Sequence, residues 1–119
     1  AGFRLCGEGT KAVRIECRIG GSDLNPYLAM AALLAAGLKG IEDKLELEPA
    51  YTGDAYSGNA SRLPGTLRDA RRELLQSEML REAFGDKVVI HYARAAEVEI
   101  EDFNRVVTDY EIARGFEMS

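Results

Sequence analysis

Apolar and polar residues alternate along residues 12–19, which read AVRIECRI. Side chains of a strand point alternately to its two sides, so this pattern predicts a strand with an apolar side and a polar side. The polar side holds Arg14, Glu16 and Arg18. A shorter run at residues 3–6 predicts another strand, and the glycines of GEGT that follow it favour a tight turn. Together the two runs predict an antiparallel β-hairpin.

A helix is predicted over residues 26–44. Ser22, Asp23 or Asn25 can cap its first turn, and Pro26 suits a position where its missing N–H costs nothing. Residues 27–38 are apolar nearly all round the helix, which is typical of a helix buried on several sides. We therefore expect this helix to belong to the core.

Residues 45–63 show no regular period, and Pro49, Gly53 and Gly58 favour a loop. A loop of this length in a compact domain often covers something. Asp54, Tyr56 and Asn59 could line a substrate entrance, although a plain surface loop is the simpler interpretation.

Helical spacing returns in the second half of the chain. Four further helices are predicted, at residues 66–75, 77–84, 86–107 and 108–114. Ser77 caps the second of these and Gly85 ends it, while Thr108 and Glu111 have the spacing of a capping box. The fold class that follows is α+β, a short N-terminal β-hairpin followed by a mainly helical segment.

Composition places the chain among globular proteins with one modest core, with 119 residues of which 46% are hydrophobic and 29% charged. The net charge of −5 argues against broad binding of nucleic acid, which needs a basic surface. The longest apolar run is too short to span a membrane. Cys6 and Cys17 form no CxxC motif, and we interpret them as reduced, buried thiols of a cytoplasmic protein. A start without Met, directly at a strand, suggests a piece of a longer protein.

The polar side of residues 12–19 has two interpretations. Alternating charges on a strand usually form a wet face, where exposed ion pairs contribute only ~0–1 kcal/mol, and spacing alone favours this. However, Arg4, Lys11, Arg14 and Arg18 are concentrated in the first eighteen residues of an acidic chain. Arginine and lysine bind carboxylates and phosphates, and a carboxylate such as Glu16 suits Mg²⁺ or Mn²⁺.

Several motifs resemble the carboxy-terminal part of the glutamine synthetase catalytic domain. They are RIECR, DLNPYLAMAALLAAGL and GIEDKLE, followed in order by LPGTLRDA, FGDKVVIHY and VTDYEIARGFE. The resemblance extends over essentially all of residues 1–119 and implies a fragment of that α/β domain. The opening FRLCGEG is more similar to glutamylpolyamine-ligase-like members than to ammonia-using enzymes. Gly115 departs from the family, which usually has an aromatic residue there.

The resemblance implies a role for each charged residue. Glu16 would be a ligand of the metal that bridges the nucleotide phosphates, and Arg18 would contact the substrate carboxylate. Arg14 would face the phosphates, and Arg4 and Lys11 would lie by the nucleotide. Arg14 and Arg18 are thus the catalytic candidates.

The activity implied is ATP-dependent ligation of glutamate to ammonia or an amine through an acyl phosphate, with Mg²⁺ or Mn²⁺. The other metal ligands of the family have no counterpart in this sequence, and we interpret His91 as structural or exposed. We therefore expect the fragment alone to be inactive. We also expect it to self-associate through residues 27–38 and unpaired strand edges, whereas the full-length family forms homo-oligomeric rings. A non-catalytic glutamine synthetase-like interaction module is the alternative.

Overall fold

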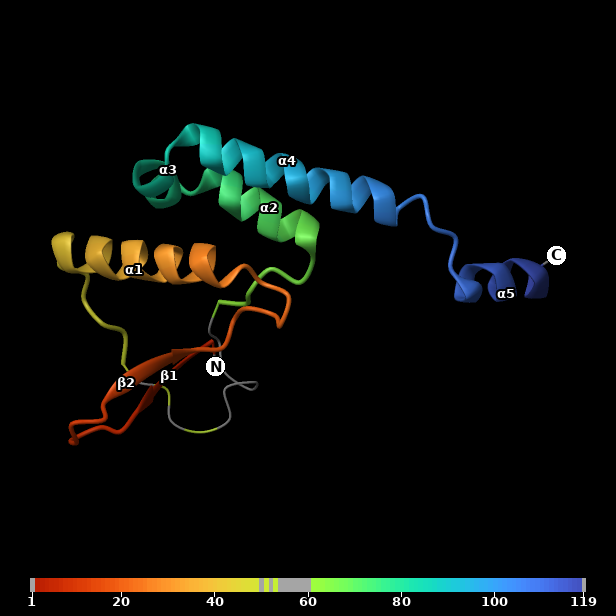
Figure 1. The fold of residues 1–119 in the computed structure, drawn as a ribbon. Coiled ribbons are helices and arrows are strands. Elements are labelled where there is room, and N and C mark those ends of the chain that lie inside the picture. The colour runs from red at the N-terminus through yellow and green to blue at the C-terminus, as the bar shows by residue number, and fades with distance from the viewer. Residues whose placement is uncertain (1, 50, 52, 54–60, 119) are drawn as a thin grey trace. The chain divides into compact units, whose positions relative to one another are not determined.

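The computed structural model describes residues 2–49, 51, 53 and 61–118. The chain divides into two compact units, residues 1–61 and 62–119. The first contains β1 (Phe3–Cys6), β2 (Arg14–Cys17) and α1 (Pro26–Glu42) (Figure 1). The second contains α2 (Leu67–Gln76), α3 (Glu78–Phe84), α4 (Asp86–Phe103) and α5 (Asp109–Glu117). A short hairpin followed by helices confirms the predicted α+β class.

The two strands pair antiparallel in a two-stranded sheet. Their register sets four pairs opposite one another: Phe3 and Cys17, Arg4 and Glu16, Leu5 and Ile15, Cys6 and Arg14. Gly7 opens the connecting turn at a φ of +69°, and a Cβ atom there would lie 2.6 Å from the backbone oxygen of Ala12. Only glycine fits this close approach in the left-handed region.

The second strand is shorter than the predicted residues 12–19. The turn continues as far as the bond from the Val13 N–H to the oxygen of Thr10, so regular pairing begins at Arg14. After Cys17 one further bond, from the Arg18 N–H to the oxygen of Gly2 at 2.8 Å, prolongs the ladder. The alternation was predicted correctly, but the turn takes up the first residues of the run.

Both sides of this hairpin are open. On the apolar side Ile15 is 72% exposed, and Cys17 is also exposed, while Cys6 on the polar side is half-buried. Both cysteines are free thiols, but the expectation that both are buried was wrong. A two-stranded sheet buries a side chain only where another element covers it, and within the first unit this hairpin has no such cover among the described residues.

Helix α1 begins as predicted and ends two residues earlier. The side-chain oxygen of Asn25 accepts from the N–H groups of Tyr27 and Leu28 at 3.0 and 3.2 Å. At the other end Lys44 takes a φ of +51°, outside the helical region. None of the residues of α1 is buried, and Tyr27 is 86% exposed. The expectation of a core helix was therefore wrong for this chain, because an all-round apolar helix needs neighbours on several sides.

The core of the second unit lies on α4, against which α2 and α3 pack (Figure 1). Val89 and Ala93 are its buried residues, each 2% exposed. Arg71 of α2 donates from Nε to the oxygen of Ala93 at 2.9 Å. Arg81 of α3 donates from Nε and Nη2 to the oxygen of Leu75, at 3.2 and 2.7 Å. These arginines fasten the three helices together through backbone oxygens.

Six helix ends of this unit differ from the prediction, most of them by one residue and those of α4 and α5 at their C-terminal ends by more. Thr66 is the cap of α2 and not its first residue, as its hydroxyl accepts from the Asp69 N–H. Helix α4 stops at Phe103, not at residue 107, because the N–H groups of Arg105 and Val106 bond three residues back, to Asp102 and Phe103, and not four residues back as in an α-helix. Helix α5 continues past residue 114 to Glu117. The capping box of Thr108 and Glu111 is confirmed.

The described parts of residues 45–63 contain no helix or strand. Asp54, Tyr56 and Asn59, the suggested substrate entrance, lie outside the described residues. No helix among the described residues is both long and apolar enough to cross a membrane.

Candidate active site

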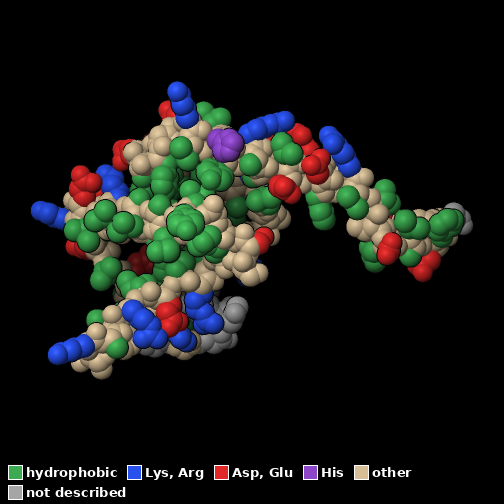
Figure 2. Space-filling model, viewed as in Figure 1, with side chains coloured by type: hydrophobic (Ala, Val, Ile, Leu, Met, Phe, Trp, Pro, Cys, Tyr) green, Lys and Arg blue, Asp and Glu red, His purple; other side chains and the backbone are tan. Residues whose placement is uncertain are grey.

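Three of the predicted site residues meet on one side of the hairpin. Glu16 accepts from Nη2 of Arg4 at 2.8 Å through one carboxylate oxygen, and from Nη2 of Arg14 at 3.2 Å through the other. The hairpin register explains the first contact, because Arg4 lies directly opposite Glu16. The second follows from strand alternation, because Arg14 and Glu16 are two residues apart. Figure 2 shows basic and acidic side chains gathered over the hairpin.

Cys6 is a fourth member of this cluster, and the sequence reasoning missed it. Nε of Arg4 donates to the sulfur of Cys6 at 3.2 Å. Cys6 also lies opposite Arg14 in the register. The sequence indicates part of this arrangement, because Arg4 and Cys6 are two residues apart and therefore lie on the same side of their strand. Only the pairing of the strands places that side beside Glu16.

The surroundings of Glu16 favour its charged form. Hydrogen bonding with Cys6 and the nearby guanidinium groups of Arg4 and Arg14 hold the pKa of its carboxyl below the ordinary value. Its side chain is 30% exposed, against 56% for Arg4 and 60% for Arg14. The cluster is therefore a carboxylate set between two more exposed cations, and the cations are the groups that an anion would meet first.

Arg18 and Lys11 are not brought into this contact network. Arg18 follows β2 and continues its backbone pairing through Gly2, so it extends the Arg14–Glu16 row by one step. Lys11 lies in the turn between the strands and is exposed. The structure thus joins Arg4, Arg14 and Glu16 directly and leaves Arg18 and Lys11 at the two ends of the hairpin.

A complete metal site is not formed by the described residues. Across residues 2–49, 51, 53 and 61–118, no three His, Cys, Asp or Glu side chains are grouped so that they could hold a metal ion. Glu16 is the only carboxylate in the arginine cluster described above. His91 is exposed on α4, in the other unit, which agrees with its interpretation as an exposed residue. Among the described residues, Glu16 is therefore the carboxylate that could serve as a metal ligand at this place.

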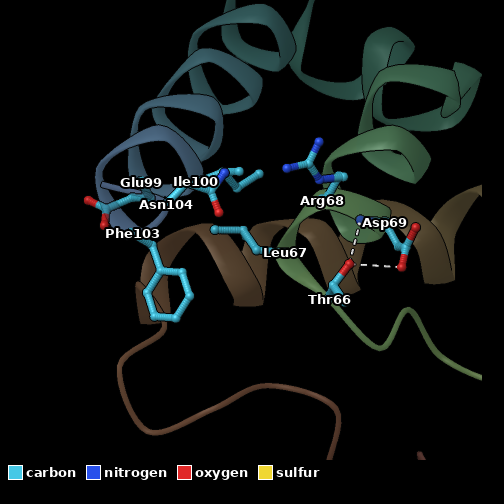
Figure 3. A pocket seen from close by; sticks show the side chains of 8 residues that line it. All are labelled: Thr66, Leu67, Arg68, Asp69, Glu99, Ile100, Phe103 and Asn104. Atoms are coloured by element: carbon cyan, nitrogen blue, oxygen red, sulfur yellow. Dashed lines mark hydrogen bonds between the residues drawn. The ribbon is translucent and has the colours of Figure 1, made fainter. Parts of the chain in front are cut away.

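A pocket of about 670 Å³ lies within the second unit, between the start of α2 and the end of α4 (Figure 3). Its lining comprises Thr66, Leu67, Arg68, Asp69, Glu99, Ile100, Phe103 and Asn104. The hydroxyl of Thr66 donates to the carboxylate of Asp69 at 2.8 Å and accepts from its N–H at 3.1 Å. These two residues serve the helix cap, and we assign the pocket no chemistry.

Comparison with known proteins bears on the family to which the chain belongs. The model of the glutamine synthetase catalytic domain matches residues 1–115. The chain belongs to this family. The motif RIECR, which first suggested the family, contributes both Arg14 and Glu16 to the cluster on the hairpin.

Relatives within the glutamine synthetase family include enzymes named for different amides. The chain is 46% identical over 115 residues to a gamma-glutamylethanolamide synthetase of Streptomyces coelicolor, matching 97% of this chain and 25% of that protein. It is 37% identical to type-1 glutamine synthetase 2 of Dictyostelium discoideum, over 93% of this chain and 22% of that protein. It is 42% identical to a glutamate–isopropylamine ligase of a Pseudomonas species, over 87% of this chain and 23% of that protein. The chain thus spans about a quarter of the length of these relatives.

Proposed function

We propose that this chain is part of an ATP-dependent ligase that joins glutamate to an amine or ammonia as a γ-glutamyl amide. The side-chain carboxylate of glutamate would attack the terminal phosphorus of ATP and release ADP. The amine nitrogen would then attack the carbonyl carbon of the acyl phosphate, with loss of a proton and of inorganic phosphate. Family membership supports the ligase class, and the relatives named for gamma-glutamyl or glutamate–amine products support this reaction.

The observation that carries the proposal is the cluster of Arg4, Glu16 and Arg14 on one side of the hairpin. Phosphoryl transfer needs fixed positive charge around the phosphate oxygens, since charge moves among them in the transition state. Arg4 and Arg14 are the more exposed members of the cluster and would contact nucleotide phosphates. Glu16 holds both guanidinium groups in place before the nucleotide arrives.

Arg18 and Lys11 would serve the two substrates separately. Arg18 stands at the end of the Arg14–Glu16 row, and its planar fork suits a carboxylate, so we assign it to glutamate. Lys11 is a point charge in the turn and would lie by the nucleotide. Phosphates on Arg14 and glutamate on Arg18 would bind along the same row of the hairpin, which would help align the carboxylate with the terminal phosphate.

Mg²⁺ or Mn²⁺ would neutralise phosphate charge in such a reaction. Glu16 is the residue of this cluster that could contribute a ligand. The described residues do not form a complete metal site, so further ligands would have to come from elsewhere. We accordingly propose that these 119 residues alone do not catalyse the reaction.

An organic amine is the acceptor that we favour over ammonia. The chain is 46% and 42% identical to the two relatives named for ethanolamide and isopropylamine products, against 37% for type-1 glutamine synthetase 2 of Dictyostelium discoideum. A cytoplasmic location fits the two free thiols. Homo-oligomerisation fits the exposed apolar surface of α1.

An acceptor screen tests the proposal. The full-length protein would be incubated with ATP, Mg²⁺ and glutamate, together with ammonia, ethanolamine, isopropylamine or putrescine. We expect ADP release that requires both glutamate and one of the organic amines. Absence of ADP release with every acceptor would contradict the ligase function, and release with ammonia alone would contradict only the choice of acceptor.

A non-catalytic interaction module is the second candidate. The observation in its favour is the exposed apolar surface of α1, which would suit docking onto a partner. Retention of Arg14, Glu16 and Arg18 speaks against it, since a docking module has no need of that row. A full-length protein that folds, oligomerises and releases no ADP would support this candidate.

A further inference from the structure

The sulfur of Cys6 makes a specific contact with a candidate phosphate-binding residue. Nε of Arg4 donates to it at 3.2 Å, while Nη2 of the same guanidinium donates to Glu16 at 2.8 Å. Cys6 is the least exposed of the four β1 residues. Arg4 is thus held at two points, one on its own strand and one on the neighbouring strand.

The planar shape of the guanidinium group determines which of its edges these two contacts use. Nε and Nη2 present parallel N–H bonds along one edge of the plane, and the Nη1–Nη2 end forms a second edge. Cys6 and Glu16 together occupy the first edge. Within the described part of the chain, Nη1 of Arg4 has no hydrogen-bond partner. The second edge therefore remains available to an anion.

We infer that Cys6 is a positioning residue, which fixes the plane of the Arg4 guanidinium so that its second edge faces the nucleotide phosphates. The inference rests on the proposed function. It assigns Cys6 no contact with substrate, because the thiol acts through Arg4. Without the sulfur contact, Arg4 would keep its ion pair with Glu16 but could turn about it, and ATP would bind more weakly.

A space-filling role is the competing explanation, and substitutions can separate the two. Cys6→Val keeps a side chain of similar size but removes the hydrogen-bond acceptor. Cys6→Ser is smaller but keeps an acceptor. Cys17→Val is the matched control, because Cys17 lies on the other side of the same hairpin, opposite Phe3. If Cys6 only fills space, valine would be tolerated at least as well as serine.

The experiment measures KM for ATP, KM for glutamate and kcat in the full-length ligase. For Cys6→Val we expect a rise of about three- to tenfold in KM for ATP, the range for one lost hydrogen bond of modest strength, with KM for glutamate unchanged. Cys6→Ser should restore most of the ATP affinity, and Cys17→Val should match wild type.

The outcomes separate this inference from the proposed function. An unchanged KM for ATP in Cys6→Val would overturn the role of Cys6, as would equal damage to both Michaelis constants in the valine and serine variants. Either result would leave the ligase function standing. A wild-type enzyme without glutamate- and amine-dependent ADP release would overturn the proposed function, and the role of Cys6 with it.

Discussion

Arg71 of α2 donates from Nε to the backbone oxygen of Ala93, twenty-two residues further along the chain, at 2.9 Å. Ala93 is one of two buried residues on α4, so this bond reaches the core of the second unit. Nη2 of Arg71 also pairs with the carboxylate of Glu97, one helical turn after Ala93, at 3.1 Å. A single arginine thus fixes both the separation and the rotation of α2 against α4.

Replacing Arg71 should therefore loosen the second unit. We expect Arg71→Met to lower its free energy of unfolding by about 1.5–3 kcal/mol, the range for a hydrogen bond that involves a charged group. Arg72→Met is the matched control, because Arg72 is 60% exposed and pairs with Asp69 on its own helix. Thermal unfolding followed by circular dichroism measures both. Equal shifts in the two variants would contradict the role of the Ala93 contact.

Glu16→Gln should abolish catalysis while leaving the fold intact. The amide keeps the size of the side chain but removes the charge that holds two arginines and that a hard cation needs. We expect kcat of the full-length ligase to fall by about a hundredfold or more, the scale for losing a key electrostatic group. Glu8→Gln, in the exposed turn, is the control and should keep wild-type turnover. Ordinary activity in Glu16→Gln would remove Glu16 from the site.

Arg18→Lys should act on glutamate more than on ATP. Lysine preserves the charge but loses the fork that grips a carboxylate at two points. We expect KM for glutamate to rise by about tenfold, with KM for ATP little changed. The reciprocal variant, Arg4→Lys, should raise KM for ATP instead. If each variant harmed both constants alike, the division of roles along the hairpin would be wrong.

The capping box of α5 should respond to acid. The hydrogen bonds from the backbone N–H and hydroxyl of Thr108, at 2.8 and 2.9 Å, lower the pKa of the Glu111 carboxyl. Because this pKa is lower in the folded state than in the unfolded state, the contact stabilises α5 at neutral pH. That contribution is lost as the pH falls through the folded pKa, below the ordinary glutamate value of about 4.3.

Carbon-detected NMR titration of Glu111 measures this directly. The midpoint should lie below that of an exposed glutamate, and Thr108→Ala, which removes the hydroxyl donor but keeps the backbone N–H, should raise it part of the way to the ordinary range. A wild-type midpoint in the ordinary glutamate range would show that the box does not form in solution.

The 119-residue chain should self-associate. Helix α1 exposes large apolar side chains along its length: Tyr27, Met30, Leu34, Leu38 and Ile41 are 59–86% exposed. Apolar surface of this extent usually finds a partner. Sedimentation at micromolar concentration should detect dimers or larger species, and Leu34→Glu should reduce them. Leu47→Glu, at an exposed leucine outside α1, is the control, and a folded, strictly monomeric wild-type chain would contradict the expectation.

The sequence predicted the local features of this protein, such as strand alternation and helix capping. It did not predict how the helices and strands pack against one another. The alternation of residues 12–19 and the cap of α1 depend on neighbours within a few positions; the alternation was predicted, and the cap is Asn25, one of the three residues that the sequence offered. The burial of α1 depends on elements that must pack around it, so an apolar pattern alone predicted it wrongly.

The candidate site divides in the same way. The row of Arg14 and Glu16 follows from strand alternation, and family resemblance supplied the roles. The contact of Arg4 with Glu16 and the place of Cys6 both depend on the pairing register, which the alternation within one strand does not specify. Helix α4 likewise ends at Phe103, where the N–H groups that follow bond three residues back, a change that helical spacing does not reveal.

The tight turn at Gly7 makes the charged cluster sensitive to a residue that carries no side chain. A Cβ atom at Gly7 would clash with the oxygen of Ala12, so Gly7→Ala would force the turn to reorganise. A slip of one position in strand pairing sends every side chain to the opposite face, which would part Arg4 from Glu16 without altering either. A genetic screen for loss of function would thus recover Gly7 together with the charged residues, as an inactivating position that binds nothing itself.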